Sequence, residues 1–153
     1  MRDALNGLKA WCDWGRRTGT RVDVVTQFCF ESDPILQWVG ELDRAGIDLP
    51  VIVGLAGPAT PATLTKFALR CGIGNSMRAL RSQIGRLLTD NGPDDVVNGL
   101  RCAPAAATAA IAGFHLFPFG GLRKSGDWLR HYDRDPLAQT ERGAMSSAAL
   151  QNP

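Results

Sequence analysis

The chain has 153 residues, 44% of them hydrophobic, which is enough for one ordinary domain and too little for two. Its formal net charge is +2, and Lys and Arg are spread without a basic run, so we expect no nucleic-acid or anionic-membrane partner. No window approaches the roughly 18 consecutive apolar residues of a membrane span, and the N-terminus lacks the apolar core of a signal peptide, which predicts a soluble, cytoplasmic protein.

Residues 3–17 are predicted to form the first helix, because apolar residues recur there at helical spacing and Arg16 and Arg17 stand where cations complement a helix C-terminus. On this helix we expect Trp11 and Trp14 to be packing residues rather than a stacking platform for a ligand.

The next segment, residues 22–30 with the sequence VDVVTQFCF, is an apolar run rich in β-branched and aromatic residues. It indicates a strand buried on both faces, which is typical of a mostly parallel sheet. The adjacent polar residues Thr26 and Gln27 interrupt the run. Burying the Gln27 amide without partners would cost roughly 1–3 kcal/mol, so Gln27 is either a core amide bonded to backbone or a group aimed at a ligand.

A strand followed by a helix recurs after this segment. Asp33 as N-cap, followed by Pro34, opens a second helix. Residues 49–55 are predicted to be a second buried strand, and its exit loop supplies Thr60 as N-cap and Pro61 to a third helix.

The second half of the chain continues this pattern with weaker signals. The predicted elements are a poorly formed strand at residues 72–75, helices over residues 77–88 and 94–101, an Ala-rich helix reaching residue 112, a strand at residues 114–119 and a last helix over residues 124–131. The polar segment 132–153 has no period, so we expect a disordered tail.

Several strand–helix units joined by short loops predict an α/β protein with parallel strands and right-handed crossovers. A doubly wound sheet and a piece of a (β/α) barrel both fit this order. In either fold, ligands bind beyond the carboxyl ends of the strands, where Gln27, the loop 56–58 and the pair Gly120 and Gly121 fall. Backbone at those two glycines can come close to a ligand phosphate or ring.

Neither the histidines nor the cysteines suggest a metal site or a disulfide. His115 has no second His, Cys or carboxylate at ligand spacing, so we predict a hydrogen-bonded strand histidine. The four cysteines are widely separated without a CxxC spacing, which favours reduced thiols over a disulfide framework. We therefore assign no metal ligand.

Six short motifs carry a resemblance to a known family. They are TQFCF at residues 26–30, AGIDLP at 45–50, VGL at 53–55, KFA at 66–68, CG at 71–72 and HLFPF at 115–119. In order and spacing, over most of residues 8–128, they resemble the C-terminal half of methylenetetrahydrofolate reductase, and the HLFPFGG ending resembles the alphaproteobacterial version. The combination of TQF with AGID and a Pro about twenty residues later is more specific than any single motif.

The resemblance implies a (β/α)₈ barrel, or TIM barrel, that holds FAD at the C-terminal face of its strands. In that family, hydride moves from NAD(P)H to FAD and then to 5,10-methylenetetrahydrofolate, giving 5-methyltetrahydrofolate for methionine biosynthesis. Residues 1–131 would then be parallel (β/α) units equivalent to the C-terminal half of a TIM barrel, incomplete on their own and followed by the disordered tail 132–153.

The family's substrate contacts map onto four positions of this chain. The resemblance implies that Gln27 hydrogen-bonds the pterin of folate and that Phe67 stacks on folate or nicotinamide. Thr63 stands where the family often has a second polar folate contact, and Phe117 stands where it often has Tyr. A flat heteroaromatic ring with an amide edge needs this combination of a stacking face and an amide partner.

Other positions concern the flavin or depart from the family. By their place on the helix before the TQF strand, the resemblance makes Lys9 and Arg16 candidates for contact with the flavin phosphates. The first four strands are absent, and with them most FAD contacts and the family's acidic residues, so no catalytic residue is assigned. Gly121 stands where the family often has an Arg that contacts substrate.

Half a barrel cannot close, because eight strands are needed to fill its interior with side chains. We therefore expect the inward face, with Val24, Phe28 and Ile52, to lack an opposing layer, and wet apolar surface costs about 25 cal/mol per Å². Such a patch predicts a partner, either an N-terminal half-barrel or a second copy in a homo-oligomer. The chain is expected to be a fragment and inactive alone.

Two classes of function stay open. The first is an oxidoreductase, in which the chain supplies the folate-binding half of a flavin-dependent methylenetetrahydrofolate reductase. The second is a non-catalytic pterin-binding, folate-binding or assembly domain derived from that barrel, which predicts folate binding without flavin. An unrelated enzyme on a doubly wound sheet is disfavoured, because the sequence has no GxGxxG, P-loop or nucleophile-elbow motif.

Overall fold

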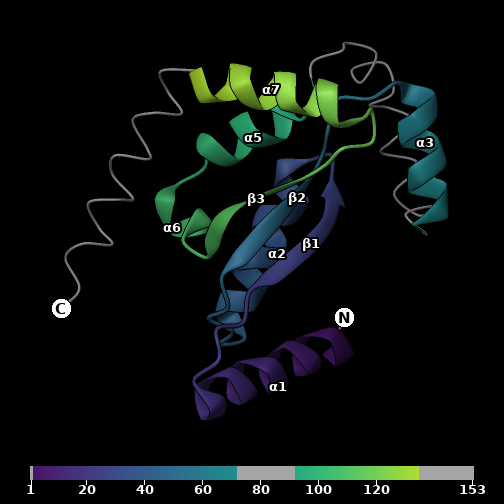
Figure 1. Ribbon diagram of the computed structural model, residues 1–153. Coiled ribbons are helices and arrows are strands. Elements are labelled where there is room, and N and C mark those ends of the chain that lie inside the picture. The colour runs from purple at the N-terminus through teal and green to yellow at the C-terminus, as the bar shows by residue number, and fades with distance from the viewer. Residues whose placement is uncertain (1, 72–91, 135–153) are drawn as a thin grey trace.

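The computed structural model describes residues 2–71 and 92–134 (Figure 1). The strand and helix predicted over residues 72–75 and 77–88, and the predicted tail beyond residue 134, lie outside the described residues. The described elements are, in chain order, α1 (Arg2–Thr18), β1 (Val24–Cys29), α2 (Ser32–Arg44), β2 (Val51–Ala56), α3 (Pro61–Arg70), α5 (Asp94–Arg101), α6 (Ala105–Thr108), β3 (Ile111–Phe117) and α7 (Leu122–Arg134). None of these helices is long and apolar enough to cross a membrane.

The three described strands form one parallel sheet in the order β1-β2-β3. Each strand pairs with the next described strand along the chain, so all three carboxyl ends meet at one edge of the sheet, near α3 and α7 in Figure 1. The predicted α/β class with parallel strands is confirmed.

Local start signals explain where the helices begin. α3 begins as predicted, because the Thr60 hydroxyl accepts a hydrogen bond from the Thr63 N–H at 3.3 Å and Pro61 follows it. α5 has the bounds predicted for it. The predicted cap of α2 is wrong: this helix begins at Ser32, so Asp33 lies inside the first turn, where its carboxylate complements the helix dipole.

The main core lies between one face of the sheet and the helices α2 and α5, and Figure 1 shows α2 behind the strands. Alternate residues of β2 point into this core because side chains of a strand change face at every residue. Its buried strand and helix residues are Val51, Val53 and Leu55 from β2, Ile35, Val39 and Leu42 from α2, and Val96, Val97 and Leu100 from α5.

The strand β1 is not buried on both faces as predicted, and it does not pair regularly. Val25 pairs with Ile52 but Phe28 pairs with Gly54, so residues 26–27 together stand opposite a single residue of β2. This arrangement is a β-bulge, and it moves the side chains that follow it to the other face of the sheet.

The bulge separates Val24 from Phe28. In a regular strand these two side chains would share a face, as predicted for the uncovered inward face. Val24 instead packs against the main core, whereas Phe28 is only 4% exposed, within a second apolar cluster. The exposed apolar side chain of this strand is Val25, at 56%. The predicted uncovered face is therefore wrong for Val24 and Phe28, and it consists of Val25 with the half-buried Ile52.

The helix α1 lies at the amino end of the sheet, away from α3 and α7 (Figure 1). Leu5, Leu8 and Cys12 pack against the main core from one side of this helix. Trp11 and Trp14 are 56% and 36% exposed and meet each other edge to face, with ring centroids 5.5 Å apart. The two tryptophans therefore pack on each other rather than in the core, because another stripe of the helix faces the sheet.

The last two described elements begin earlier or end later than predicted. β3 begins at Ile111 because its pairing with β2 begins there, and the predicted Ala-rich helix, α6, is correspondingly shorter. α7 continues past residue 131, and its Tyr132 stacks on Trp128 with ring centroids 5.1 Å apart. The predicted disordered tail is therefore wrong for residues 132–134, which are helical.

Candidate functional site

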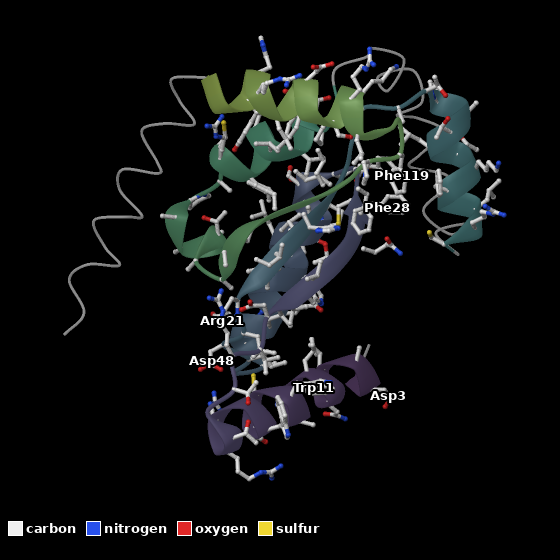
Figure 2. The ribbon with its side chains drawn as sticks, viewed as in Figure 1. Asp3, Trp11, Arg21, Phe28, Asp48 and Phe119 are labelled. Carbon is white, nitrogen blue, oxygen red and sulfur yellow. The ribbon has the colours of Figure 1, made fainter. Side chains whose placement is uncertain are left out.

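Five phenylalanine side chains gather at the carboxyl ends of the strands and are called the aromatic cluster below: Phe28, Phe30, Phe67, Phe117 and Phe119. Phe67 from α3 stacks on Phe119, with ring centroids 4.6 Å apart and planes 25° from parallel. Phe28 meets Phe119 edge to face at 4.8 Å, and Figure 2 shows these two rings beside each other. Each such pair adds about 0.5–1.5 kcal/mol beyond area burial, so the cluster fixes β1, β3 and α3 relative to one another.

Two loops at this edge are held together by close backbone contacts at glycines. The Gly57 N–H donates to the Phe117 carbonyl at 2.9 Å, which ties the loop after β2 to β3. A Cβ added at Gly120 would lie 1.9 Å from the Pro58 carbonyl oxygen, so the close approach predicted at Gly120 is made to the protein's own backbone. Gly121 has a φ of +94°, and an added Cβ would meet nothing within 4 Å.

Gln27 is exposed at the bulge, immediately before Phe28 of the aromatic cluster. Its Oε1 accepts a hydrogen bond from the Phe28 N–H at 3.2 Å, which fixes the orientation of the amide because an N–H can only donate. Its Nε2 has no hydrogen-bond partner among the described residues, and one lone pair of Oε1 is also left. Of the two predicted roles, the exposure excludes a core amide and leaves an amide that a ligand can reach.

The helix α3 brings two predicted site residues to this edge. Thr63 and Phe67 are one turn apart and so share a side of the helix. The Thr63 hydroxyl lies 2.9 Å from the Thr60 hydroxyl, as part of the helix cap. Phe67 and Phe117 both contact Phe119. The two rings predicted to contact a ligand therefore meet in one cluster, with the Thr63 hydroxyl at its border.

His115 borders the aromatic cluster, a position that the sequence did not indicate. Its ring meets the Phe117 ring edge to face, with centroids 4.6 Å apart. The side chain is exposed and makes no hydrogen bond to another described residue, so the predicted hydrogen-bonded histidine is wrong. Strand alternation is the signal that places it here, because residues two apart on β3 share a face.

The two flavin-phosphate candidates, Lys9 and Arg16, belong to α1 at the amino end of the sheet. Arg16 Nη2 lies 2.7 Å from Asp48 Oδ1, and Figure 2 shows Asp48 at the opposite end of the sheet from Phe28 and Phe119. This hydrogen-bonded ion pair lowers the pKa of Asp48 and raises the pKa of Arg16. Because the last turn of α1 leads into the amino end of β1, Arg16 has to lie there. The structure does not bring these two residues to the aromatic cluster.

A separate cavity of about 390 Å³ lies beside this ion pair, with Arg16, Arg21 and Asp48 in its wall. Cys12 also lines it, and the Cys12 Sγ lies 3.6 Å from Asp48 Oδ1. Arg16 is thus part of a hollow at the amino end of the sheet, separate from the carboxyl edge where Gln27 lies.

No family model matches the chain. The resemblance to methylenetetrahydrofolate reductase therefore rests on its motifs. The geometry brings Phe67 and Phe117 together beside the strand that carries Gln27, and leaves Lys9 and Arg16 at the other end of the sheet.

All four cysteines are free thiols, and two of them are expected to resist alkylation. Burial raises the pKa of Cys12 and of Cys29, which lowers their thiolate fraction at neutral pH, whereas Cys71 and Cys102 are exposed. At about pH 8 we expect iodoacetamide to modify the two exposed thiols at least about tenfold faster, with the gap narrowing as pH rises towards the raised pKa values. Peptide mass spectrometry over time measures these rates, and equal rates at all four cysteines would contradict the burial.

Proposed function

We propose that this chain is the folate-binding half of a flavin-dependent methylenetetrahydrofolate reductase, built from the parallel (β/α) units of the C-terminal half of a TIM barrel. The observation that carries the proposal is the state of Gln27: an exposed amide with an unpaired Nε2, next to a cluster of stacked rings at the carboxyl edge of a parallel sheet. Parallel α/β sheets bind their ligands at this edge.

The chemistry of this edge suits a pterin. A pterin is a flat heteroaromatic ring whose rim carries both hydrogen-bond donors and acceptors. Gln27 offers a donor through Nε2 and a remaining acceptor site on Oε1, while Phe67 offers a ring on which a pterin or a nicotinamide stacks. Phe117 extends the apolar wall, and the Thr63 hydroxyl is the second polar contact in this proposal.

Uncovered strand edges support the barrel half. Within residues 2–71 and 92–134, β1 and β3 each pair only with β2, which leaves one edge of each without a neighbouring strand. Val25 is exposed on the face opposite the main core. Further strands would cover both the open edges and this apolar face. We propose that an N-terminal half-barrel or a second copy of the chain supplies them.

The position of Arg16 favours a second candidate function. FAD and NAD(P)H binding would draw on the missing half of the barrel, and the two residues of this chain assigned to the flavin phosphates belong to α1, at the other end of the sheet. A non-catalytic domain that binds a pterin without flavin needs only the carboxyl edge, with Gln27 and Phe67.

Folic acid is expected to bind the purified chain, and the variants Gln27→Ala and Phe67→Ala should each weaken that binding about tenfold, because one removes the amide and the other the stacking face. Isothermal titration calorimetry measures the dissociation constants. Gln37→Ala is the matched amide control, since Gln37 is exposed on α2, and Phe114→Ala is the matched ring control, since Phe114 is exposed on β3. Either no binding to the unaltered chain or an equal loss in the controls would refute the proposed site.

A separate measurement distinguishes the two candidate functions. The chain is mixed with the N-terminal half of a methylenetetrahydrofolate reductase, and the mixture is assayed for bound flavin and for NADH-dependent reduction of methylenetetrahydrofolate. Flavin binding in the mixture, with turnover that Gln27→Ala lowers, supports the reductase half. Folic acid binding with no flavin in the mixture supports the non-catalytic domain.

A further inference from the structure

Thr26 stands at the bulge of β1, one residue before Gln27, and makes the hydrogen bond that joins the bulge to β2. We propose that Thr26 is a positioning residue of the candidate site: its hydroxyl, together with the missing side chain of Gly54, decides which way Gln27 and Phe28 point. We take the ligand, a pterin, from the proposed function and the geometry from the strand pairing alone.

The Thr26 hydroxyl replaces a rung of the backbone ladder between β1 and β2. It accepts a hydrogen bond from the Gly54 N–H at 2.9 Å and donates to the Gln27 carbonyl at 2.8 Å. The Gln27 carbonyl also accepts from the Cys29 Sγ at 3.2 Å. The buried N–H of Gly54 is thereby paired although the main chain of β1 has moved out of register.

Gly54 supplies the space that the bulge needs. A Cβ added at this position would lie 2.7 Å from the carbonyl oxygens of both Thr26 and Gln27. No side chain fits at that distance, so only glycine lets the two carbonyls of the bulge approach β2 this closely.

Loss of the hydroxyl would leave the Gly54 N–H buried without a partner, which disfavours the bulge. Without the bulge, β1 would return to regular alternation, and Phe28 would move to the face where Val24 packs against the main core. Phe28 would then leave Phe119, and Gln27 would lose the Phe28 N–H that orients its amide. Thr26 therefore acts on a ligand through Gln27.

Two substitutions separate the hydroxyl from the shape of the side chain. Thr26→Val removes the hydroxyl at nearly constant shape, and Thr26→Ser keeps it. With folic acid as the calorimetric probe, we expect Thr26→Val to weaken binding about tenfold, as Gln27→Ala does, and Thr26→Ser to weaken it less than about twofold. The double variant Thr26→Val/Gln27→Ala should bind no more weakly than Gln27→Ala alone. A loss of about a hundredfold in the double variant, or unchanged binding in Thr26→Val, would overturn the inference.

Hydrogen exchange at the Gly54 amide tests the geometry without any ligand. We expect Thr26→Val to exchange this amide at least about tenfold faster and to lose the NMR cross-peaks between the Phe28 and Phe119 rings, and Thr26→Ser to keep both signals. A chain that binds no folic acid refutes the proposed function, and these two signals then decide the role of Thr26. Unchanged signals in Thr26→Val overturn that role. Thr26→Ala replaces Thr26→Val if the latter does not fold, and loss of the fold in Thr26→Ser as well also overturns it.

Discussion

A Gly54→Ala variant is expected to lose about 3 kcal/mol of unfolding free energy, at the upper end of what overpacking costs in a tight site. The added Cβ would stand 2.7 Å from the carbonyl oxygens of Thr26 and Gln27, and these main-chain atoms cannot rotate away as a side chain can. Either the strand pair separates or the bulge is lost. Urea denaturation should show a lower midpoint with an unchanged slope.

Gly113→Ala is the matched control, because Gly113 is also a strand glycine and lies in β3. An added Cβ there would meet the Cδ1 of Ile52 at 3.8 Å, an ordinary contact. Since alanine restricts the unfolded chain, this variant is expected to equal the unaltered protein or to exceed its stability by up to about 1 kcal/mol. Equal destabilisation at both positions would show that the bulge does not set the requirement for Gly54.

A Leu42→Ala variant is expected to lose about 3–5 kcal/mol of unfolding free energy, because truncation leaves a cavity in the main core that the surrounding helices and sheet fill only partly. Leu42 is 0% exposed on the face of α2 that belongs to this core. Urea unfolding followed by circular dichroism measures the loss.

The control for this truncation is Leu129→Ala on α7, where the side chain is 44% exposed. We expect its unfolding free energy to change by less than about 0.5 kcal/mol, since surface substitutions away from a core contact seldom exceed that. A comparable loss in both variants would mean that α2 and the sheet are not packed as the structure describes.

Local signals predicted most of the described elements, because they act within one or two turns of chain. Thr60 and Pro61 begin α3 as expected, and α5 has its predicted bounds. The apolar runs located β1 and β2 to within two residues of their ends. The weaker agreement at β3 has the same origin: its start is set by pairing with β2, which a local window does not contain.

The candidate site was predictable where topology alone decides the outcome. Gln27, Phe67 and Phe117 lie near the carboxyl ends of strands or in the helix that follows, so any parallel sheet gathers them at one edge. Arg16 was misplaced because its partner, Asp48, lies 32 residues away, and His115 was missed because its neighbour is a ring that only the folded strand presents.

By itself, the sequence determined the alternation of strands and helices, the parallel class of the sheet and the segments that reach its carboxyl edge, because apolar periodicity and capping residues encode these locally. Only the tertiary structure decided which face each side chain of β1 occupies. The extra residue of the bulge depends on one hydrogen bond from Gly54 to Thr26 across 28 positions, and a strict period of two contains no signal for it. That bond places Phe28 with the aromatic cluster, leaves Val24 in the main core and exposes Val25.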